Sequence, residues 1–287
     1  STPIKSSAAS DVYKRQGFYA AARAKGSSLA EEKFLFLGAG EAAGGIADLL
    51  VEAMMKEGLT QEEAINRIFL FDSHGLVTKD REGLTPLKQK FAHEQEPQST
   101  FLDAIGEVKP TAIVGCAAQA GSFNAYVLSA MARINERPII FALSNPTSRS
   151  ECTAREAYTY TEGKCLFASG SPFPQVELNG KTFIPRQSNN SYVFPGIGLG
   201  LVVSSPRVVP QSVFLSAAEA LSKMVSEEDL ENGSLFPPLI KIREVSQSIA
   251  AAVAEQCFTT GVAGVSNPVD LSEAIQAAMY KPVYDQI

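Results

Sequence analysis

The sequence predicts an α/β protein with a doubly wound, mostly parallel sheet of the Rossmann type, a hairpin insertion and long helices towards the C-terminus. Short, continuous apolar runs alternate with segments of helical period, which is the pattern of parallel strands covered by helices on both faces. The first run, residues 34–37, ends in a glycine-rich turn that opens a helix. An Asn-Gly pair at residues 179–180 stands between two alternating segments, as is typical of a β-hairpin.

The predicted strands follow one another through the first part of the chain. Each is short and apolar throughout, as expected for strands that are buried on both faces of a parallel sheet. They cover residues 34–37, 67–71, 111–114, 139–143 and 165–168. The hairpin is predicted over residues 176–184.

Helical segments separate these strands. In residues 41–56 apolar side chains recur at helical spacing, and Gly58 supplies a stop signal. After Pro195 the chain becomes helical. The other predicted helices cover residues 18–24, 100–108, 123–135, 153–161, 211–224 and 238–259.

The first sixteen residues do not fit this pattern. The chain does not begin with Met, and residues 6–16 show no periodicity that continues into the next segment of the chain. We interpret residues 1–16 as a leader that is non-native or disordered, and residues 17–287 as one domain. A flexible natural leader is the alternative.

Composition narrows the class of protein. The net charge of −6 and the pI near 5.2 do not suggest a nucleic-acid partner. No apolar run approaches the length of a membrane span, so no membrane partner is predicted. Four widely spaced cysteines and two histidines exclude a Cys/His metal site and suggest a reducing compartment. We therefore expect a cytoplasmic location, or an organelle if a targeting peptide preceded this sequence.

The turn Gly38-Ala39-Gly40 predicts a dinucleotide site. Gly38 allows the tight turn, Gly40 lets a pyrophosphate approach the backbone, and Ala43 is the small residue at which helix packs on strand. The unpaired N–H groups at the start of the helix then face the phosphates. A purely structural glycine turn is the alternative, but the strand before and the helix after supply the context that the binding motif requires.

Small or polar residues follow four of the predicted strands. In open parallel sheets, ligands bind beyond the carboxyl ends of the strands, so these loops are predicted to share one site. Turns are polar for other reasons too, which is the competing interpretation. The four segments are residues 38–40, 72–75, 115–118 (which begins with Gly115) and 144–147.

Residues near the second strand address the choice of cofactor. An acid at the position of Asp72 usually accepts hydrogen bonds from the adenosine ribose and repels a 2′-phosphate. Ser73, Lys88 and Lys90 lie beyond it, and a hydroxyl with ammonium groups near that ribose favours NADP. If both lysines are solvated surface residues, Asp72 alone favours NAD.

Amides and histidines complete the candidate residues. Asn145, Asn189 and Asn190 lie in loops, where an amide can orient a carboxylate or a carboxamide, although turn-forming Asn is the commoner case. His74 and His93 could act as general bases by chemistry, but neither lies near a motif acid. Both are predicted to be surface histidines.

Several blocks together resemble the C-terminal, cofactor-binding domain of malic enzymes. The resemblance runs from about Gly17 to the end of the chain, and it implies an NAD(P)-binding domain over residues 17–287. The NNSYVFPG block argues against another dehydrogenase of the same fold. The blocks are FLGAGEAAGGIA, FALSNPTS, LFASGSPF, NNSYVFPGIGLG, LFPPL and MYKPVY.

Malic enzymes convert (S)-malate to pyruvate and CO₂ with NAD or NADP and a divalent metal, Mg²⁺ or Mn²⁺. The resemblance implies this activity for the parent protein, and a homo-oligomer in the full-length form. It implies that Asn145 and one or both of Asn189 and Asn190 contact malate or the nicotinamide end. It also implies that the pyrophosphate is held by Gly38, Ala39, Gly40, Ala42 and Ala43.

The resemblance also bears on NADP. In members that use NADP, a Ser follows the ribose acid and a Lys lies three residues before a Phe-Ala-His sequence. Ser73 and Lys88 match both features, whereas His74 departs from the Lys often seen after that Ser. NADP is the expected cofactor, with NAD as the alternative.

The catalytic Tyr and Lys of the family, and its metal-binding acids, lie upstream of the glycine turn. The residues before that turn carry none of those motifs here. We therefore expect a missing N-terminal catalytic domain, no catalytic or metal-binding residue in this chain, and no activity of the chain alone. A non-catalytic nucleotide-binding module is the alternative.

Overall fold

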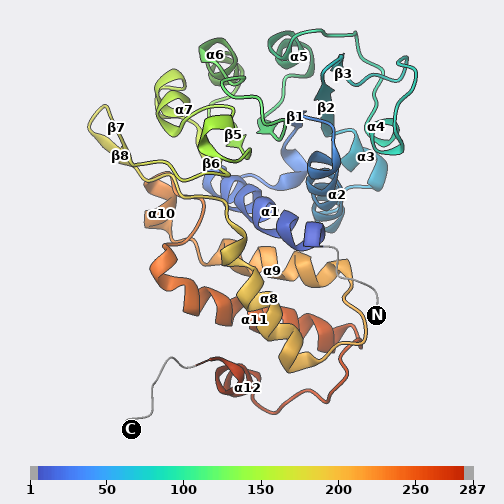
Figure 1. The fold of residues 1–287 in the computed structure, drawn as a ribbon, viewed down its shortest axis with the longest axis vertical. Helices are drawn as coiled ribbons and strands as arrows, with labels where there is room; N and C mark the ends of the chain where they lie inside the picture. The colour runs from blue at the N-terminus through green and yellow to red at the C-terminus, as the bar shows by residue number, and fades with distance from the viewer. Residues whose placement is uncertain (1–5, 281–287) are drawn as a thin grey trace.

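The computed structural model describes residues 6–280, with side chains from Gln16 onward. Its centre is a six-stranded sheet in the order β3-β2-β1-β4-β5-β6, in which every neighbouring pair is parallel except β2 and β3 (Figure 1). This confirms the predicted fold class. The strands are β1 (Phe34–Leu37), β2 (Ile68–Asp72), β3 (Gly75–Leu76), β4 (Ala112–Gly115), β5 (Ile139–Ala142) and β6 (Leu166–Ser169).

The parallel strands end level with one another. Leu37 at the end of β1 is opposite both Phe71 and Gly115, and the next two partners in the row are Ala142 and Ser169. The loops that follow these strands therefore emerge side by side at one edge of the sheet.

Helices cover both faces of the sheet, as a doubly wound fold requires. Phe34 and Phe36 belong to the core on one face, and Leu35 and Leu37 belong to the core on the other. In Figure 1 the helices α5, α6 and α7 lie together on one side of the strands. The helices of this part are α1 (Ser6–Lys25), α2 (Glu41–Lys56), α3 (Gln61–Ile65), α4 (Pro86–Lys90), α5 (Phe101–Val108), α6 (Ala125–Ile134) and α7 (Ala154–Tyr160).

Helix α1 is longer than the helix predicted over residues 18–24. The described part of the predicted leader is helical, because α1 begins at Ser6 rather than near Phe18. Gln16 is fully buried and donates a hydrogen bond to the Leu235 carbonyl oxygen at 2.8 Å. Further along α1, the ring of Phe18 stacks on Phe141 at a centroid distance of 4.2 Å. Residues 1–5 lie outside the described part, and the non-native origin of residues 1–16 stays a prediction.

The predicted hairpin and C-terminal helices are present. Strands β7 (Val176–Leu178) and β8 (Lys181–Phe183) pair antiparallel, and Asn179 and Gly180 between them both have positive φ, as a tight hairpin turn requires. The helices that follow form a separate layer beside α1 (Figure 1). They are α8 (Phe194–Ser204), α9 (Gln211–Lys223), α10 (Glu227–Glu231), α11 (Ile242–Thr259) and α12 (Leu271–Ala278). Across residues 6–280, no helix combines the length and the apolar character needed to cross a bilayer.

The surface position predicted for His93 is wrong. Its side chain is buried, because residues 75–93 fold back along β2 and place its Nε2 2.7 Å from the Ile68 carbonyl oxygen. Its ring lies 4.4 Å from the ring of Phe69. Burial lowers the pKa of His93, the bond to Ile68 opposes this, and the charges of Lys79 and Lys33 lower it further. His74, by contrast, is exposed as predicted.

We expect the buried imidazole of His93 to make folding sensitive to acid. Its folded pKa lies below the ordinary value of 6.5, so the unfolded chain takes up the proton first. The stability it contributes is present above pH 6.5 and is lost as the pH falls from there towards the folded pKa. Thermal unfolding at several pH values should show this slope in the unmodified chain and a flatter one in His93→Gln. An identical slope in both would assign the effect to other groups.

Candidate functional site

A pocket of about 630 Å³ opens at the carboxyl ends of β1, β2 and β4. The structure thus brings three of the four predicted loops to one cavity. Asn145, Asn189, Asn190, Gly115, Ala42 and Ala43 do not line it. The candidate residues that do line it are Gly38, Ala39, Gly40, Asp72, Ser73 and Lys88.

The two glycines of the turn meet different requirements. Gly38 has a φ of +115°, and a Cβ there would lie 3.1 Å from the carbonyl carbon of Cys116, so backbone geometry demands glycine. Gly40 has ordinary backbone angles, and a Cβ there would meet no atom within 4 Å. The space above Gly40 is therefore open towards the pocket, as a pyrophosphate cradle would be.

Helix α2 begins at this cradle. Gly40 is its N-cap residue and offers no side chain to the first N–H groups, which leaves these donors for an anion. Ala43 is buried against the sheet, whereas Ala42 is exposed. Any contact of Ala43 with a phosphate would therefore come from its backbone.

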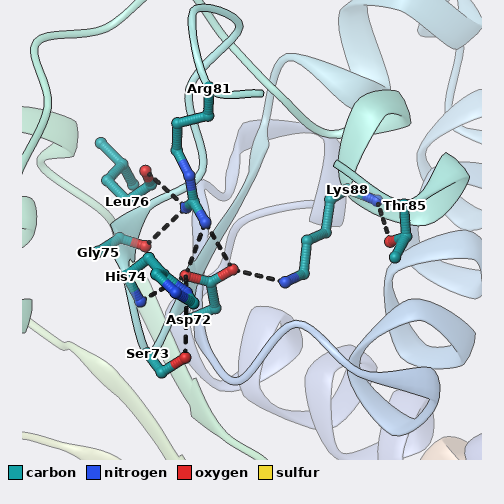
Figure 2. A network of polar contacts seen from close by, with 8 residues as sticks. All are labelled: Asp72, Ser73, His74, Gly75, Leu76, Arg81, Thr85 and Lys88. Atoms are coloured by element: carbon teal, nitrogen blue, oxygen red, sulfur yellow. Dashed lines mark hydrogen bonds and ion pairs between the residues drawn. The ribbon is translucent and has the colours of Figure 1, made fainter. Parts of the chain in front are cut away.

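Asp72 is the centre of a charged network at the other end of the pocket (Figure 2). Its carboxylate accepts hydrogen bonds from Arg81 Nη2 at 3.0 and 2.9 Å, from Lys88 Nζ at 2.6 Å and from the backbone N–H of His74 at 2.8 Å. Arg81 is held in place because its Nη1 also donates to the carbonyl oxygens of Gly75 and Leu76. A carboxylate has about four acceptor positions, and these bonds fill them.

The network keeps Asp72 ionised. Burial raises the pKa of its carboxyl, but the hydrogen bonds from Arg81, Lys88 and the His74 N–H outweigh this effect and lower the pKa to about 2. The two cations and one carboxylate leave one net positive charge beside Ser73 and the pocket. The sequence alone did not identify Arg81, because its position in a charged loop does not distinguish an arginine that binds an acid from one that is solvated.

Lys88 and Lys90 have different surroundings. Lys88 lines the pocket, and its ammonium group uses one of its three donors on Asp72. Lys90 pairs with Asp48 of α2 at 2.6 Å and does not line the pocket. The structure therefore places Lys88, and not Lys90, at the pocket, in agreement with the match of Lys88 to the pattern of NADP-using family members.

The three candidate amides lie near the end of β6. Asn145 is exposed, and its Oδ1 accepts a hydrogen bond from Ser171 Oγ at 2.9 Å, just after β6. The segment that leads to Asn189 joins the same strand end, because the N–H of Ser188 donates to the carbonyl oxygen of Ser169. Asn189 uses its Oδ1 to cap the short turn at residues 190–192, which is the turn-forming role that is the commoner one for Asn. The ligand-binding roles of all three stay predictions.

Gly115 has a structural reason to be glycine. It is the last residue of β4, and a Cβ there would lie 2.4 Å from the carboxyl carbon of Glu151. Sequence reasoning missed this buried acid, which the loop after β5 places beneath the end of β4.

Comparison with known proteins decides the family. A family model described as "Malic enzyme, NAD binding domain" matches residues 11–258. This chain belongs to the malic enzyme family.

Curated malic enzymes match most of this chain. The "NADP-dependent malic enzyme" of Homo sapiens is 48% identical over 273 residues, which cover 94% of this chain and 48% of the relative. The "NADP-dependent malic enzyme, chloroplastic" of Zea mays is 47% identical over 93% of this chain and 43% of the relative. The "NAD-dependent malic enzyme, mitochondrial" of Ascaris suum is 46% identical over 90% of this chain and 40% of the relative. The chain spans about half the length of the curated malic enzymes it matches.

Solved structures share the fold. The crystal structure of the malic enzyme from Entamoeba histolytica superposes with a TM-score of 0.72 at 21% identity, covering 94% of this chain and 53% of that chain. The malic enzyme from Pyrococcus horikoshii gives the same score and identity and is covered to 57%.

Proposed function

We propose that the chain is the NADP-binding half of a protein that oxidatively decarboxylates (S)-malate to pyruvate and CO₂. Membership of the malic enzyme family supports the reaction class. The choice of NADP over NAD is supported by the network of Asp72, Arg81 and Lys88, which leaves a net positive charge beside the pocket. A 2′-phosphate carries the complementary negative charge, and a charge-assisted hydrogen bond from Lys88 would favour it.

Asp72 then has an indirect role. Its acceptor positions are filled by the side chains of Arg81 and Lys88 and by the backbone N–H of His74. Asp72 would therefore orient Lys88 rather than hydrogen-bond the ribose itself. An NAD-dependent protein is the second candidate. The 46% identity to the NAD-dependent malic enzyme of Ascaris suum favours it.

Bound NADP would supply the hydride acceptor. The residues of this chain would bind and orient it: the turn at Gly38 and Gly40 takes the pyrophosphate, and Ser73 with Lys88 takes the 2′-phosphate. Asn145 lies at the end of the sheet where β5 and β6 finish, and its amide would orient a carboxamide or carboxylate there.

The side chains that the structure describes include no ligand set for the divalent metal of the reaction. Among the side chains described for residues 16–280, no group of three or more His, Cys, Asp or Glu is arranged to hold a metal ion. The acids and the acid–base pair of the reaction would belong to the part of the protein outside this sequence.

We also propose the cytoplasm or an organelle as the location, and a homo-oligomer as the full-length form. Relatives named chloroplastic and mitochondrial support an organelle.

We expect the chain alone to bind NADP without oxidising malate. The cradle and the charged network are complete within it, whereas the resemblance assigns proton transfer and polarisation of the keto group to the family's upstream Tyr, Lys and metal-binding acids. Purified chain should therefore show saturable NADP binding by calorimetry and no increase in absorbance at 340 nm with malate and Mn²⁺. Malate-dependent NADPH formation would contradict the assignment of catalysis to residues outside this sequence. A failure to bind either dinucleotide would contradict the proposed function.

A further inference from the structure

A buried carboxylate lies directly beneath the loop that forms one wall of the pocket. Glu151 is fully buried, and its carboxyl group occupies the space that a side chain at Gly115 would need. Packing alone does not explain an acid here, since an apolar side chain would fill the space without the cost of desolvating a carboxylate.

Two donors of Ser144, in the loop after β5, bind this carboxylate. Oε1 of Glu151 accepts a hydrogen bond from the Ser144 hydroxyl, and Oε2 accepts one from the Ser144 N–H at 3.3 Å. No lysine, arginine or histidine between residues 16 and 280 forms an ion pair with it. Burial raises the pKa of Glu151, and the bonds from Ser144 oppose that rise.

Ser144 extends the contact to the pocket wall. Its Oγ accepts a hydrogen bond from the N–H of Ala118 at 2.9 Å. Ala118 has a φ of +53°, a left-handed conformation that non-glycine residues seldom adopt. Such a conformation persists only where the surroundings hold it, and outliers of this kind gather at ligand sites.

The loop held in this way touches the glycine turn. The N–H of Cys116 donates to the Leu37 carbonyl oxygen at 2.9 Å, and the backbone of Cys116 and Ala117 closes over Gly38. Cys116 and Ala117 also line the pocket. A displacement of this loop would therefore change the shape of the cavity where the dinucleotide is proposed to bind.

We propose that Glu151 is a positioning residue of the dinucleotide site, whose carboxylate, through Ser144, holds the loop after β4 in the shape that the cofactor requires. This inference rests on the proposed function, because it assumes that the pocket takes NADP. Glu151 itself does not line the pocket and acts through Ser144, whose hydroxyl binds the N–H of Ala118.

The test compares two carboxylates that each bind backbone N–H groups. Glu151→Gln replaces an acceptor oxygen by an amide NH₂ group that faces donors, and it should weaken NADP binding about tenfold or more. Glu156→Gln is the matched control, since Glu156 also accepts from a backbone N–H, that of Thr153 at 2.8 Å, but caps α7 away from the pocket. It should change the NADP dissociation constant by less than about twofold, because no bond to the pocket wall is lost.

Amide hydrogen exchange without any ligand separates positioning from general instability. In Glu151→Gln, exchange at Ala117 and Ala118 should speed up while exchange at Ile113 in the sheet stays unchanged. Ser144→Ala, which removes the link to Ala118, should give the same pattern, and the double variant should be little worse than either single one. This second variant decides the question if Glu151→Gln does not fold.

The outcomes distinguish two failures. If the unmodified chain binds no NADP, the proposed function falls, and this role falls with it. If the unmodified chain binds NADP and Glu151→Gln binds it equally well, only the role of Glu151 is overturned. Equal acceleration of exchange at Ala117 and Ile113 would also overturn it, because Glu151 would then support the whole fold rather than the loop.

Discussion

Replacing Lys88 by Gln is expected to weaken NADP binding by about tenfold to a hundredfold and to leave NAD binding nearly unchanged. Lys88 lines the pocket, and its ammonium group donates one hydrogen bond to Asp72, which leaves two further donors for a 2′-phosphate. NAD lacks that phosphate, so the substitution removes no hydrogen bond of comparable strength from the NAD complex. The measurement is the dissociation constant of each cofactor by calorimetry at low ionic strength.

Lys90→Gln is the matched control for this result. Lys90 belongs to the same helix, α4, but its ammonium group pairs with Asp48 outside the pocket. It should leave both cofactors unaffected. The preference of the unmodified chain should shrink as salt is added, because the Lys88 side chain is 23% exposed and salt screens its charge. Equal weakening of NAD and NADP in Lys88→Gln would mean that the 2′-phosphate has been assigned to the wrong residue.

Replacing Gly40 by Val is expected to abolish dinucleotide binding with little loss of fold. A side chain at position 40 would meet no protein atom within 4 Å, so it is accommodated in the free chain and fills the place of the pyrophosphate. Circular dichroism and thermal unfolding should resemble those of the unmodified chain, while calorimetry should detect no binding of NADP or NAD.

Two further glycines make the test specific. Gly106 in α5 also faces open space, so Gly106→Val should keep cofactor binding. Gly38→Val should lower stability as well as binding, because Gly38 has a positive φ and lies against Cys116. Undiminished affinity in Gly40→Val would show that the phosphates do not bind at this turn.

The sheet was predictable because its signals are local. Residues 34–37 and 41–56 match β1 and α2, since Gly38 follows the strand and Gly40 and Gly58 flank the helix. Strand β3 was not predicted, because its two residues carry no alternation and form a strand only by pairing with β2. Helix α3 is also too short to show a period, and only the capping box of Thr60 and Glu63 marks it.

The charges of the site were less predictable than its loops. The glycine turn and Asp72 follow strands, so their arrival at one edge of the sheet could be inferred. The pairing of Asp72 with Arg81 depends on how the loop after β3 folds back, which spacing does not reveal. The burial of Glu151 and His93 depends in the same way on contacts with distant strands.

The central claim, a nicotinamide dinucleotide site that prefers NADP, is tested most directly by titrating the unmodified chain with NADP and with NAD in the same buffer. The positive charge that Lys88 and Arg81 leave beside Asp72 predicts one site per chain and a lower dissociation constant for NADP than for NAD. Tighter binding of NAD, or no binding of either dinucleotide, would contradict it.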